Sequence, residues 1–460
     1  YTWSASHVPA GLTLQGNGTL TGTPPAVGSD SLTASVTDHA GHTVSRTLPL
    51  TVTEVPSGAP PVRISVASDG TEANGWSGQS QFAPPDQEQQ ALSDDGRFVA
   101  YASAATNLVP GDTNGYLDVF LWDRTTQTTS RVSVSTSGAQ ANGPSGSPAI
   151  SGDGRYVSFS SRATNLVTGD TNSRQDIFVW DRTTGTTTRI SVAANGTQAN
   201  LDSIGSSMSS DGRFITYESE ATNLVAGGTS SDLDVYLWDR TNGATVRVSA
   251  SSPAPTYQAS ENPSISSNGR YIAYESSAST LVPGDTNGEP DIFVWDRTTG
   301  TTVRITNGDS FSIAASISGD GRFVTFMSYA TNLVPNDTNS IDDVFVWDRT
   351  TGTTVRITNG NDRSLAPVIS ADGRFVAYFF QGYLAPGDDF TRDEVYLWDR
   401  TTGATALIST GADGAPANDD AGFPAMSGDG RFIAYESYAT NLVPDDTNAV
   451  GDIFLWDRLG

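Results

Sequence analysis

The sequence has 460 residues, a formal net charge of -26 and no cysteine. Without cysteine the chain has no disulfides and no thiol chemistry, and so acidic a chain lacks the basic surface that nucleic-acid binding requires. No apolar run approaches the ~20 residues of a membrane-spanning helix, so we expect no membrane span.

The first segment, residues 1–55, has strand-like alternation of apolar residues at Leu32–Val36 and Leu48–Val52. Its motifs VPAGLTL, GTLTGTP and VTDHAGHTVS resemble the immunoglobulin-like, cadherin-like modules of bacterial surface proteins. The resemblance implies a small immunoglobulin-like β-sandwich. The segment supplies only four or five of the roughly seven strands of such a sandwich, so we expect a partial domain.

The missing strands have two explanations. Either the natural chain extends beyond Tyr1, or an extended segment from a second subunit completes the sheet by strand addition. The second explanation predicts self-assembly, because a head-to-tail contact that does not close propagates into a fibre. The stretch EVPSGAPP ends the segment, and we place a linker at residues 56–61.

Residues 62–460 are built from one repeated pattern. Its W-D-R step returns every 51 to 58 residues, each time after a D-G-R turn in which Asn268 once replaces the aspartate. A repeat of this length is a supersecondary unit that buries its faces by stacking on its neighbours. The tryptophans of the W-D-R steps are Trp122, Trp180, Trp238, Trp295, Trp347, Trp398 and Trp456.

One unit, Ser151–Val192, predicts four short strands. An Asp153-Gly154 turn leads into Tyr156–Phe159, and Ile177–Trp180 follows a polar loop; both runs are apolar on both faces, as in strands buried within a stack of sheets. A T-T-G hairpin then leads to Thr188–Val192. Four antiparallel strands in each of seven units predict an all-β fold, a seven-bladed β-propeller.

The ends of the repeat region predict how the ring closes. The last unit stops at Leu459-Gly460 without a fourth strand, while a spare copy of that strand, Val62–Val66, precedes the first unit. We therefore predict that Val62–Val66 pairs antiparallel with Ile453–Asp457, which would remove two exposed sheet edges.

The S-x-D-G-R-aromatic core of the repeat resembles the TolB-like β-propeller repeats, over residues 62–460. The resemblance implies the propeller fold. It does not imply one activity, because such repeats serve as periplasmic adaptors, surface modules and accessory domains of peptidases. The core begins at Ser93, Ser151, Ser209, Ser318, Ser370 and Ser427, and in a variant form at Ser266.

The chain has no lysine, and 20 of its 25 arginines lie at three repeat positions, in D-G-R, W-D-R and R-[IV]-[ST]. Such regular placement favours structural ion pairs over a ligand site. An example is the pair that we expect across one hairpin, between Asp296 and Arg304.

The loop between the second and third strands reads D-T-N-x-x-x-D in five units. Its carboxylate and amide oxygens suit calcium, and the repeated repulsion between carboxylates in a chain of charge -26 favours a bound cation. The alternative is that Asp112 and Asn114 form Asx-turns with their own backbone. The predicted calcium ligands are Asp112, Asn114, Asp118, Asp170, Asn172, Asp176, Asp285, Asn287, Asp291, Asp337, Asn339, Asp343, Asp446, Asn448 and Asp452.

Two units depart from this loop pattern, and we expect weak or absent binding in the third and leave the sixth open. The third has Gly228, Ser230 and Asp234, and the sixth has Asp388, Phe390 and Glu394.

Catalysis has little support in the repeats. All three histidines lie in residues 1–55, which excludes Ser-His-Asp hydrolysis and histidine-ligated zinc elsewhere. Carboxylate chemistry such as glycoside hydrolysis stays open through Glu218, Glu275 and Glu436. These share one repeat position in different units, so we expect them to be dispersed around the ring and predict no catalytic residue.

The connections between units vary most, at Asp69–Asp86, Ser251–Asn262 and Gly411–Phe423, and are the candidate binding loops. The sequence thus predicts a secreted or cell-surface module for binding, adhesion or assembly, stabilised by calcium, whose ligand is a protein or a carbohydrate. The alternative is a polysaccharide-active enzyme or an accessory domain of a larger hydrolase.

Overall fold

The computed structural model describes residues 1–8, 12–14, 16, 20–22, 28–52, 58–78, 90–227, 232–249, 258–335, 337–358, 362–381 and 392–460. The chain forms two compact units, residues 1–57 with Thr402–Ala404 and the remainder. The elements in the described ranges are all β-strands, and no helix there is long and apolar enough to cross a membrane.

The first unit has five strands among its described residues. β1 (Thr2–His7), β4 (Gly28–Thr37) and β5 (Thr43–Val52) form one antiparallel sheet in the order β1-β4-β5, and β2 (Leu12–Leu14) pairs with β3 (Leu20–Gly22). In β4 the side chains alternate, because Leu32 and Ala34 are buried while Thr33 and Ser35 hydrogen-bond across to β5. This alternation is typical of a sheet with one covered face.

The second unit consists of seven four-stranded antiparallel sheets over the described residues, called sheets 1 to 7 in chain order. Sheet 1 has β7 (Gln90–Leu92), β8 (Phe98–Ser103), β9 (Asp118–Asp123) and β10 (Thr128–Arg131); sheet 2 has β11 (Ser145–Ile150), β12 (Tyr156–Ser161), β13 (Asp176–Asp181) and β14 (Thr186–Arg189). Sheet 3 has β15 (Ser203–Met208), β16 (Phe214–Ser219), β17 (Asp234–Asp239) and β18 (Ala244–Arg247); sheet 4 has β19 (Ser260–Ile265), β20 (Tyr271–Ser276), β21 (Asp291–Asp296) and β22 (Thr301–Arg304).

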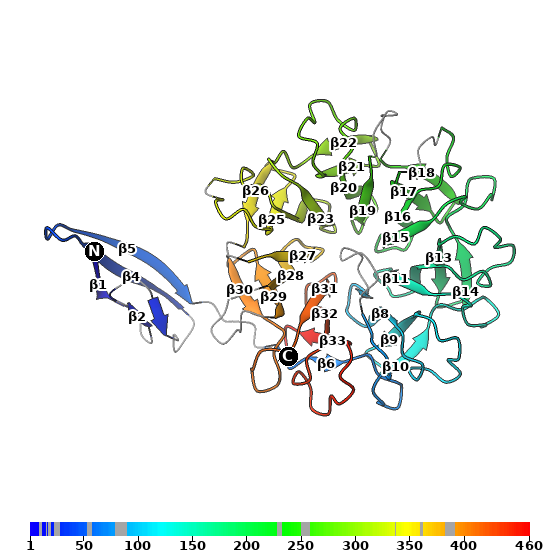
Figure 1. Ribbon diagram of the computed structural model, residues 1–460, viewed down its shortest axis with the longest axis horizontal. Coiled ribbons are helices and arrows are strands. Elements are labelled where there is room, and N and C mark those ends of the chain that lie inside the picture. The colour runs from blue at the N-terminus through cyan, green and yellow to red at the C-terminus, as the bar shows by residue number, and fades with distance from the viewer. Residues whose placement is uncertain are drawn as a thin grey trace. The chain divides into compact units, whose positions relative to one another are not determined.

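The remaining sheets repeat this order, with the first strand of each nearest the common centre in Figure 1. Sheet 5 has β23 (Ser312–Ile317), β24 (Phe323–Ser328), β25 (Asp343–Asp348) and β26 (Thr353–Arg356); sheet 6 has β27 (Ser364–Ile369), β28 (Phe375–Gln381), β29 (Asp393–Asp399) and β30 (Ala404–Leu407). Sheet 7 has β31 (Ala421–Met426), β32 (Phe432–Ser437), β33 (Asp452–Asp457) and, as its outermost strand, β6 (Val62–Arg63).

The position of β6 joins the two ends of this unit. Val62 lies opposite Leu455 and Arg63 opposite Phe454, and the Ile64 N–H donates to the Ile453 carbonyl at 2.8 Å. The paired segment is shorter than Val62–Val66, because Val66 instead bridges to Glu72.

The second and third strands are apolar on both faces because both faces are covered. All six residues of β8 and of β12 are buried, and one cluster of buried side chains joins Tyr101 and Phe120 of sheet 1 to Phe432 and Ile453 of sheet 7. Sheet 1 therefore packs on sheet 7 as well as on sheet 2.

The D-G-R turns form a repeated contact between neighbouring sheets. The glycine has a positive φ, 67° at Gly154, and a Cβ there would overlap the Phe98 ring of the preceding sheet. The W-D-R arginine of the same sheet, Arg182, lies 4.2 Å from the centroid of that ring. Between sheets 1 and 7 the same contact recurs, with Arg124 lying 4.3 Å from the Phe432 ring.

The S-x-D-G-R turns also meet around the centre, where backbone hydrogen bonds join six of the seven pairs of neighbouring turns. Asp94 N–H donates to the Gly152 carbonyl at 3.0 Å, and Asp429 N–H donates to the Asp94 carbonyl at 3.4 Å. The other four bonds run from Gly152 to Ser210, Ser210 to Ser267, Gly319 to Ala371 and Ala371 to Gly428. The innermost strands thus end in turns that are hydrogen-bonded to their neighbours at all junctions but the one between sheets 4 and 5 among the described residues.

The expected pair between Asp296 and Arg304 is wrong. Arg304 lies opposite Phe293 in the β21–β22 hairpin. Phe293 is three residues from Asp296, so the two side chains point to opposite faces of the sheet. Asp296 instead accepts two hydrogen bonds from the D-G-R arginine, Arg270, at 3.0 and 2.8 Å.

Candidate functional site

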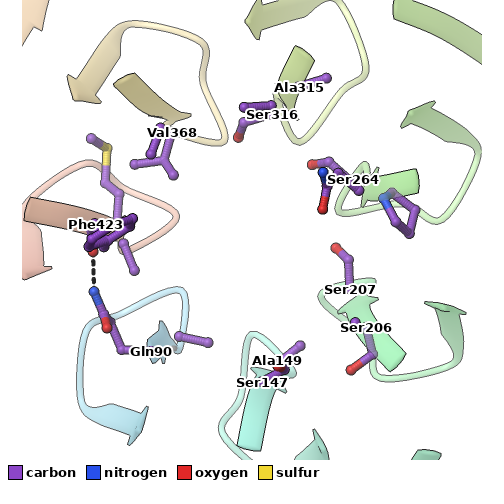
Figure 2. A pocket seen from close by; sticks show the side chains of 18 of the residues that line it. Gln90, Ser147, Ala149, Ser206, Ser207, Ser264, Ala315, Ser316, Val368 and Phe423 are labelled. Carbon is purple, nitrogen blue, oxygen red and sulfur yellow. Dashed lines mark hydrogen bonds between the residues drawn. The ribbon is translucent and has the colours of Figure 1, made fainter. Parts of the chain in front are cut away.

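The innermost strands of all seven sheets enclose a central cavity of about 240 Å³ (Figure 2). Six of these strands, those of sheets 2 to 7, contain a register shift next to a residue with positive φ. Such β-bulges re-aim the side chains that follow. The positive-φ residues are Ser147, Gly205, Asn262, Ala314, Ala366 and Phe423.

One repeat position on the innermost strands forms a ring of cavity-lining side chains. Its members from sheet 1 to sheet 7 are Ala91, Ala149, Ser207, Ser264, Ser316, Val368 and Ala425. The three serines belong to consecutive sheets, so one arc of the wall carries hydroxyls while the rest of this ring is apolar. Figure 2 shows Ser207, Ser264 and Ser316 facing the cavity.

Each of these three hydroxyls is held by the next sheet. The Ile265 N–H donates to Ser207 Oγ at 3.3 Å, and the Ile317 and Ile369 N–H groups donate to Ser264 and Ser316 at 3.1 and 3.3 Å. The oxygens are therefore fixed as acceptors, which leaves their O–H groups to donate toward the cavity.

The opposite arc carries Phe423 and Gln90. The Phe423 ring lies 4.9 Å from the Phe379 ring, and Gln90 Nε2 donates to the Phe423 carbonyl. Gln90 is only 1% exposed, and its Oε1 has no hydrogen-bond partner among the described residues. This ring of residues was not among the predicted sites, although alignment of the repeats at their serine and alanine positions would have exposed it.

Two glutamates that we expected to be dispersed meet at one residue. Glu218 Oε1 accepts the Asn262 N–H at 2.8 Å, and Glu275 Oε1 accepts from Asn262 Nδ2 at 3.1 Å. Glu275 Oε2 also accepts the Ala314 N–H at 2.7 Å, so both carboxylates satisfy backbone amides of bulges in the next sheet. This shared contact of the two glutamates with Asn262 could not be predicted from the sequence, because the contact depends on the geometry of the β-bulge. Glu436 lies in sheet 7, beside Gly78.

The D-T-N loops are organised around arginine. In sheet 1 the Arg131 Nη1 lies 3.0 Å from Asp112 Oδ1 and 3.3 Å from Asp118 Oδ2, and Ser133 donates to Asp118 at 2.5 Å. Asn114 Nδ2 donates to Asp118, while Asn114 Oδ1 accepts the Tyr116 N–H in an Asx-turn. Burial raises the pKa of Asp118, and the guanidinium supplies the positive charge beside both carboxylates.

The other four loops place the predicted ligands in the same way. The R-[IV]-[ST] arginine or its counterpart Arg63 contacts both aspartates of each loop: Arg189 with Asp170 and Asp176, Arg304 with Asp285 and Asp291, Arg356 with Asp337 and Asp343, and Arg63 with Asp446 and Asp452. Asn172, Asn287, Asn339 and Asn448 each donate to the second aspartate. Burial raises the pKa of Asp452 to about 6.

Calcium at these loops stays a prediction. The described residues contain no group of three or more histidine, aspartate or glutamate side chains arranged to hold a metal ion. In sheet 3 the Arg247 guanidinium lies 2.9 Å from Asp234. Outside the described residues lie Gly228 and Ser230 of that loop, Asp388 and Phe390 of the sixth, and the connecting residues 79–86 and 251–257.

Comparison with known proteins finds a domain-family match within the first unit and solved structures of similar fold. The family described as "Putative Ig domain" matches residues 1–53. No curated protein matches the chain. An oligogalacturonate lyase in complex with manganese is 12% identical over 94% of this chain and 97% of its own, with a TM-score of 0.51.

Two further solved structures are similar. The oligogalacturonate lyase from Vibrio parahaemolyticus is 12% identical over 94% of this chain and 96% of its own, with a TM-score of 0.51. TolB from Acinetobacter baumannii is 16% identical over 74% of this chain and 76% of its own, with a TM-score of 0.39. The chain is thus an all-β protein with an immunoglobulin-like domain and a propeller-type unit of four-stranded sheets.

Proposed function

We propose that the chain is a secreted or cell-surface binding module in which a seven-bladed β-propeller offers its central cavity to a ligand. The observation that carries this proposal is the cavity of about 240 Å³, to which every innermost strand contributes side chains. Concave sites of this kind, with a few placed polar groups, are the usual sites of ligand binding.

Three contacts support a closed ring of seven blades. β6 pairs with β33, Arg124 lies over the Phe432 ring, and Asp429 donates to the Asp94 carbonyl. Each joins a residue near the start of the second unit to one near its end. A closed ring fixes the cavity wall, and a rigid wall lowers the entropy lost on binding.

The polar contacts at the cavity favour binding over catalysis. Glu218 and Glu275 accept backbone N–H groups of the next sheet, which is a positioning role for the wall. The Asp–Arg–Asp contacts of the D-T-N loops likewise hold connections between strands. Calcium at these loops would add to the same stabilisation.

Adhesion or assembly through the first unit is the remaining part of the proposal. Val44 is 71% exposed and Leu48 41% exposed on β5, which is an edge strand of its sheet. Exposed apolar residues on an edge strand suit the addition of a further strand. Light scattering on the purified chain tests this part, because a monodisperse monomer would leave no role for a donated strand.

A cavity-narrowing variant tests the binding function. Ala91→Val with Ala149→Val fills space at a repeat position where sheet 6 already has Val368. We expect this variant to lose binding to an array of immobilised glycans and surface proteins, while Ala244→Val, on the exposed start of β18, keeps it. Equal binding by both variants would contradict the proposal.

A second candidate function is polysaccharide cleavage, favoured by the approach of Glu218 and Glu275 to Asn262 beside the cavity. Two carboxylates are the minimum for acid and base chemistry on a glycosidic bond. Release of reducing ends from a polysaccharide panel, abolished by Glu218→Gln, would support an enzyme instead of a binding module.

A further inference from the structure

The polar groups of the cavity wall define the chemistry of what it binds. Ser207, Ser264 and Ser316 each accept a backbone N–H from the next sheet, and no acceptor for their own O–H is found among the described residues. A hydroxyl fixed in this way presents a donor. Three consecutive sheets therefore form an arc of O–H donors.

The opposite side of the cavity is apolar apart from Gln90. The Gln90 side chain is held in place, because its amide nitrogen donates to the Phe423 carbonyl, and its buried Oε1 is not open to the cavity. Val368, Phe423 and Met426 provide the apolar surface nearby.

The charge of the wall disfavours anionic ligands. Glu218 is the only ionisable side chain among the described residues that line the cavity, and its carboxylate already accepts the Asn262 N–H. A wall without a cationic side chain, in a chain of net charge -26, disfavours anions. The ligand should therefore not be an anion, and an uncharged molecule whose hydroxyls accept from the serines and whose C–H face is apolar fits these groups.

We infer that the cavity binds a neutral sugar residue, such as the terminal residue of a glycan. This inference rests on the proposed binding function and names its ligand class. Sugar hydroxyls accept from the serine arc, while the C–H face of the sugar ring packs on Val368 and Phe423. The cavity volume of about 240 Å³ exceeds the roughly 150 Å³ of a protein cavity that holds benzene, which leaves room for one such residue.

The test is titration of the full chain with D-glucose, D-galactose, D-mannose and N-acetylglucosamine, and separately with D-galacturonate, followed by NMR. We expect at least one neutral sugar to bind, and D-galacturonate to bind at least about tenfold more weakly than that sugar. Ser264→Ala with Ser316→Ala should weaken binding about tenfold, from two lost hydrogen bonds. This double variant should fold, because Ala149 occupies the same repeat position in sheet 2.

Thr184→Ala, in an exposed hairpin, is the control and should bind as the unchanged chain does. Failure of every neutral sugar to bind, tighter binding of D-galacturonate, or an unchanged affinity in the double serine variant would each overturn the inference. The experiments distinguish failure of the sugar inference from failure of the proposed binding function. A ligand of another class that the Ala91→Val with Ala149→Val variant no longer binds would refute the sugar and keep the binding module.

Discussion

Single residues decide how the sheets of the second unit stack. Phe98 lies within 4.6 Å of the Arg97 guanidinium from its own sheet and 4.2 Å of the Arg182 guanidinium from the next, measured to the ring centroid. Gly154 of the next sheet lies over the same ring without room for a Cβ. Cation–π contacts of this kind stabilise by about 0.5–2 kcal/mol each, and this one recurs at every junction between sheets.

Gly154→Ala should destabilise the second unit by about 2–4 kcal/mol, the sum of overpacking against Phe98 and the left-handed backbone. The matched control is Gly185→Ala, where φ is 69° and nothing lies within 4 Å of the added Cβ, so only about 1–2 kcal/mol of backbone strain remains. Urea unfolding of the two variants measures the difference. Equal losses would mean that the ring contact does not matter.

The Asp–Arg–Asp contacts place charge inside the loops. We expect Arg131→Gln to cost about 3–5 kcal/mol, because it leaves Asp112 and Asp118 buried without their guanidinium. Arg162→Gln is the control, since the Arg162 side chain is 53% exposed and its pair with Asp202 is screened by solvent, so we expect little loss. Chemical denaturation of both variants checks the order, and a larger loss for Arg162→Gln would contradict it.

The W-D-R aspartates make the stability of the folded state depend on pH in the acidic range. Hydrogen bonds from Arg322 lower the pKa of Asp348 to about 2. A lowered pKa means that the folded state favours the ionised form, so this contribution is present above the unfolded pKa of about 4 and is lost as the pH falls toward 2. The difference in thermal stability between the unchanged chain and Asp348→Asn should therefore shrink from pH 5 to pH 2. A constant difference would contradict the assignment.

At the scale of elements, β6 is the fourth strand of sheet 7, although it is distant in sequence from the other three strands of that sheet. Ile64 is fully buried, and Ser65 Oγ donates to Asp452, so the segment contributes side chains as well as a backbone ladder. Burial of a side chain of this size contributes about 1.5–3 kcal/mol.

Removal of residues 1–66 should lower the Tm of the second unit by several degrees, because β33 loses its partner and Asp452 loses Arg63. Removal of residues 1–57 is the matched control and should leave this Tm unchanged, since it spares the paired segment. Differential scanning calorimetry separates the two. Identical Tm values for both truncated chains would refute a role of β6 in stability.

At the scale of the whole molecule, the metal content remains to be measured. The sequence predicts calcium at five loops, and each loop has a guanidinium beside its two carboxylates. If calcium binds as predicted, elemental analysis will find it in the purified protein, and a chelator will lower the Tm by mass action. If the protein contains none, arginine is the only counter-charge and the Asx-turn alternative is preferred.

Local patterns in the sequence predicted the strands and their number per repeat, because the second and third strands are short and apolar on both faces and turn residues bound every strand. Side-chain contacts between strands and between sheets were harder to predict. The pair between Asp296 and Arg270 and the meeting of Glu218 and Glu275 at Asn262 depend on sheet faces and bulges that neighbouring residues do not encode. The role of the cavity serines could not be predicted either, because their hydroxyls are oriented by N–H groups of the next sheet.

The pairing of β6 with β33 has a mechanical consequence. The two strands are antiparallel, and the Ala59 N–H donates to the Asp457 carbonyl at 3.1 Å. The first residue of β6 and the last residue of β33 therefore lie at the same end of the strand pair. A pulling force applied through residue 58 and residue 460 loads these hydrogen bonds one after another, as in opening a zipper. Tension that enters through the linker therefore acts first on the pairing of β6 with β33.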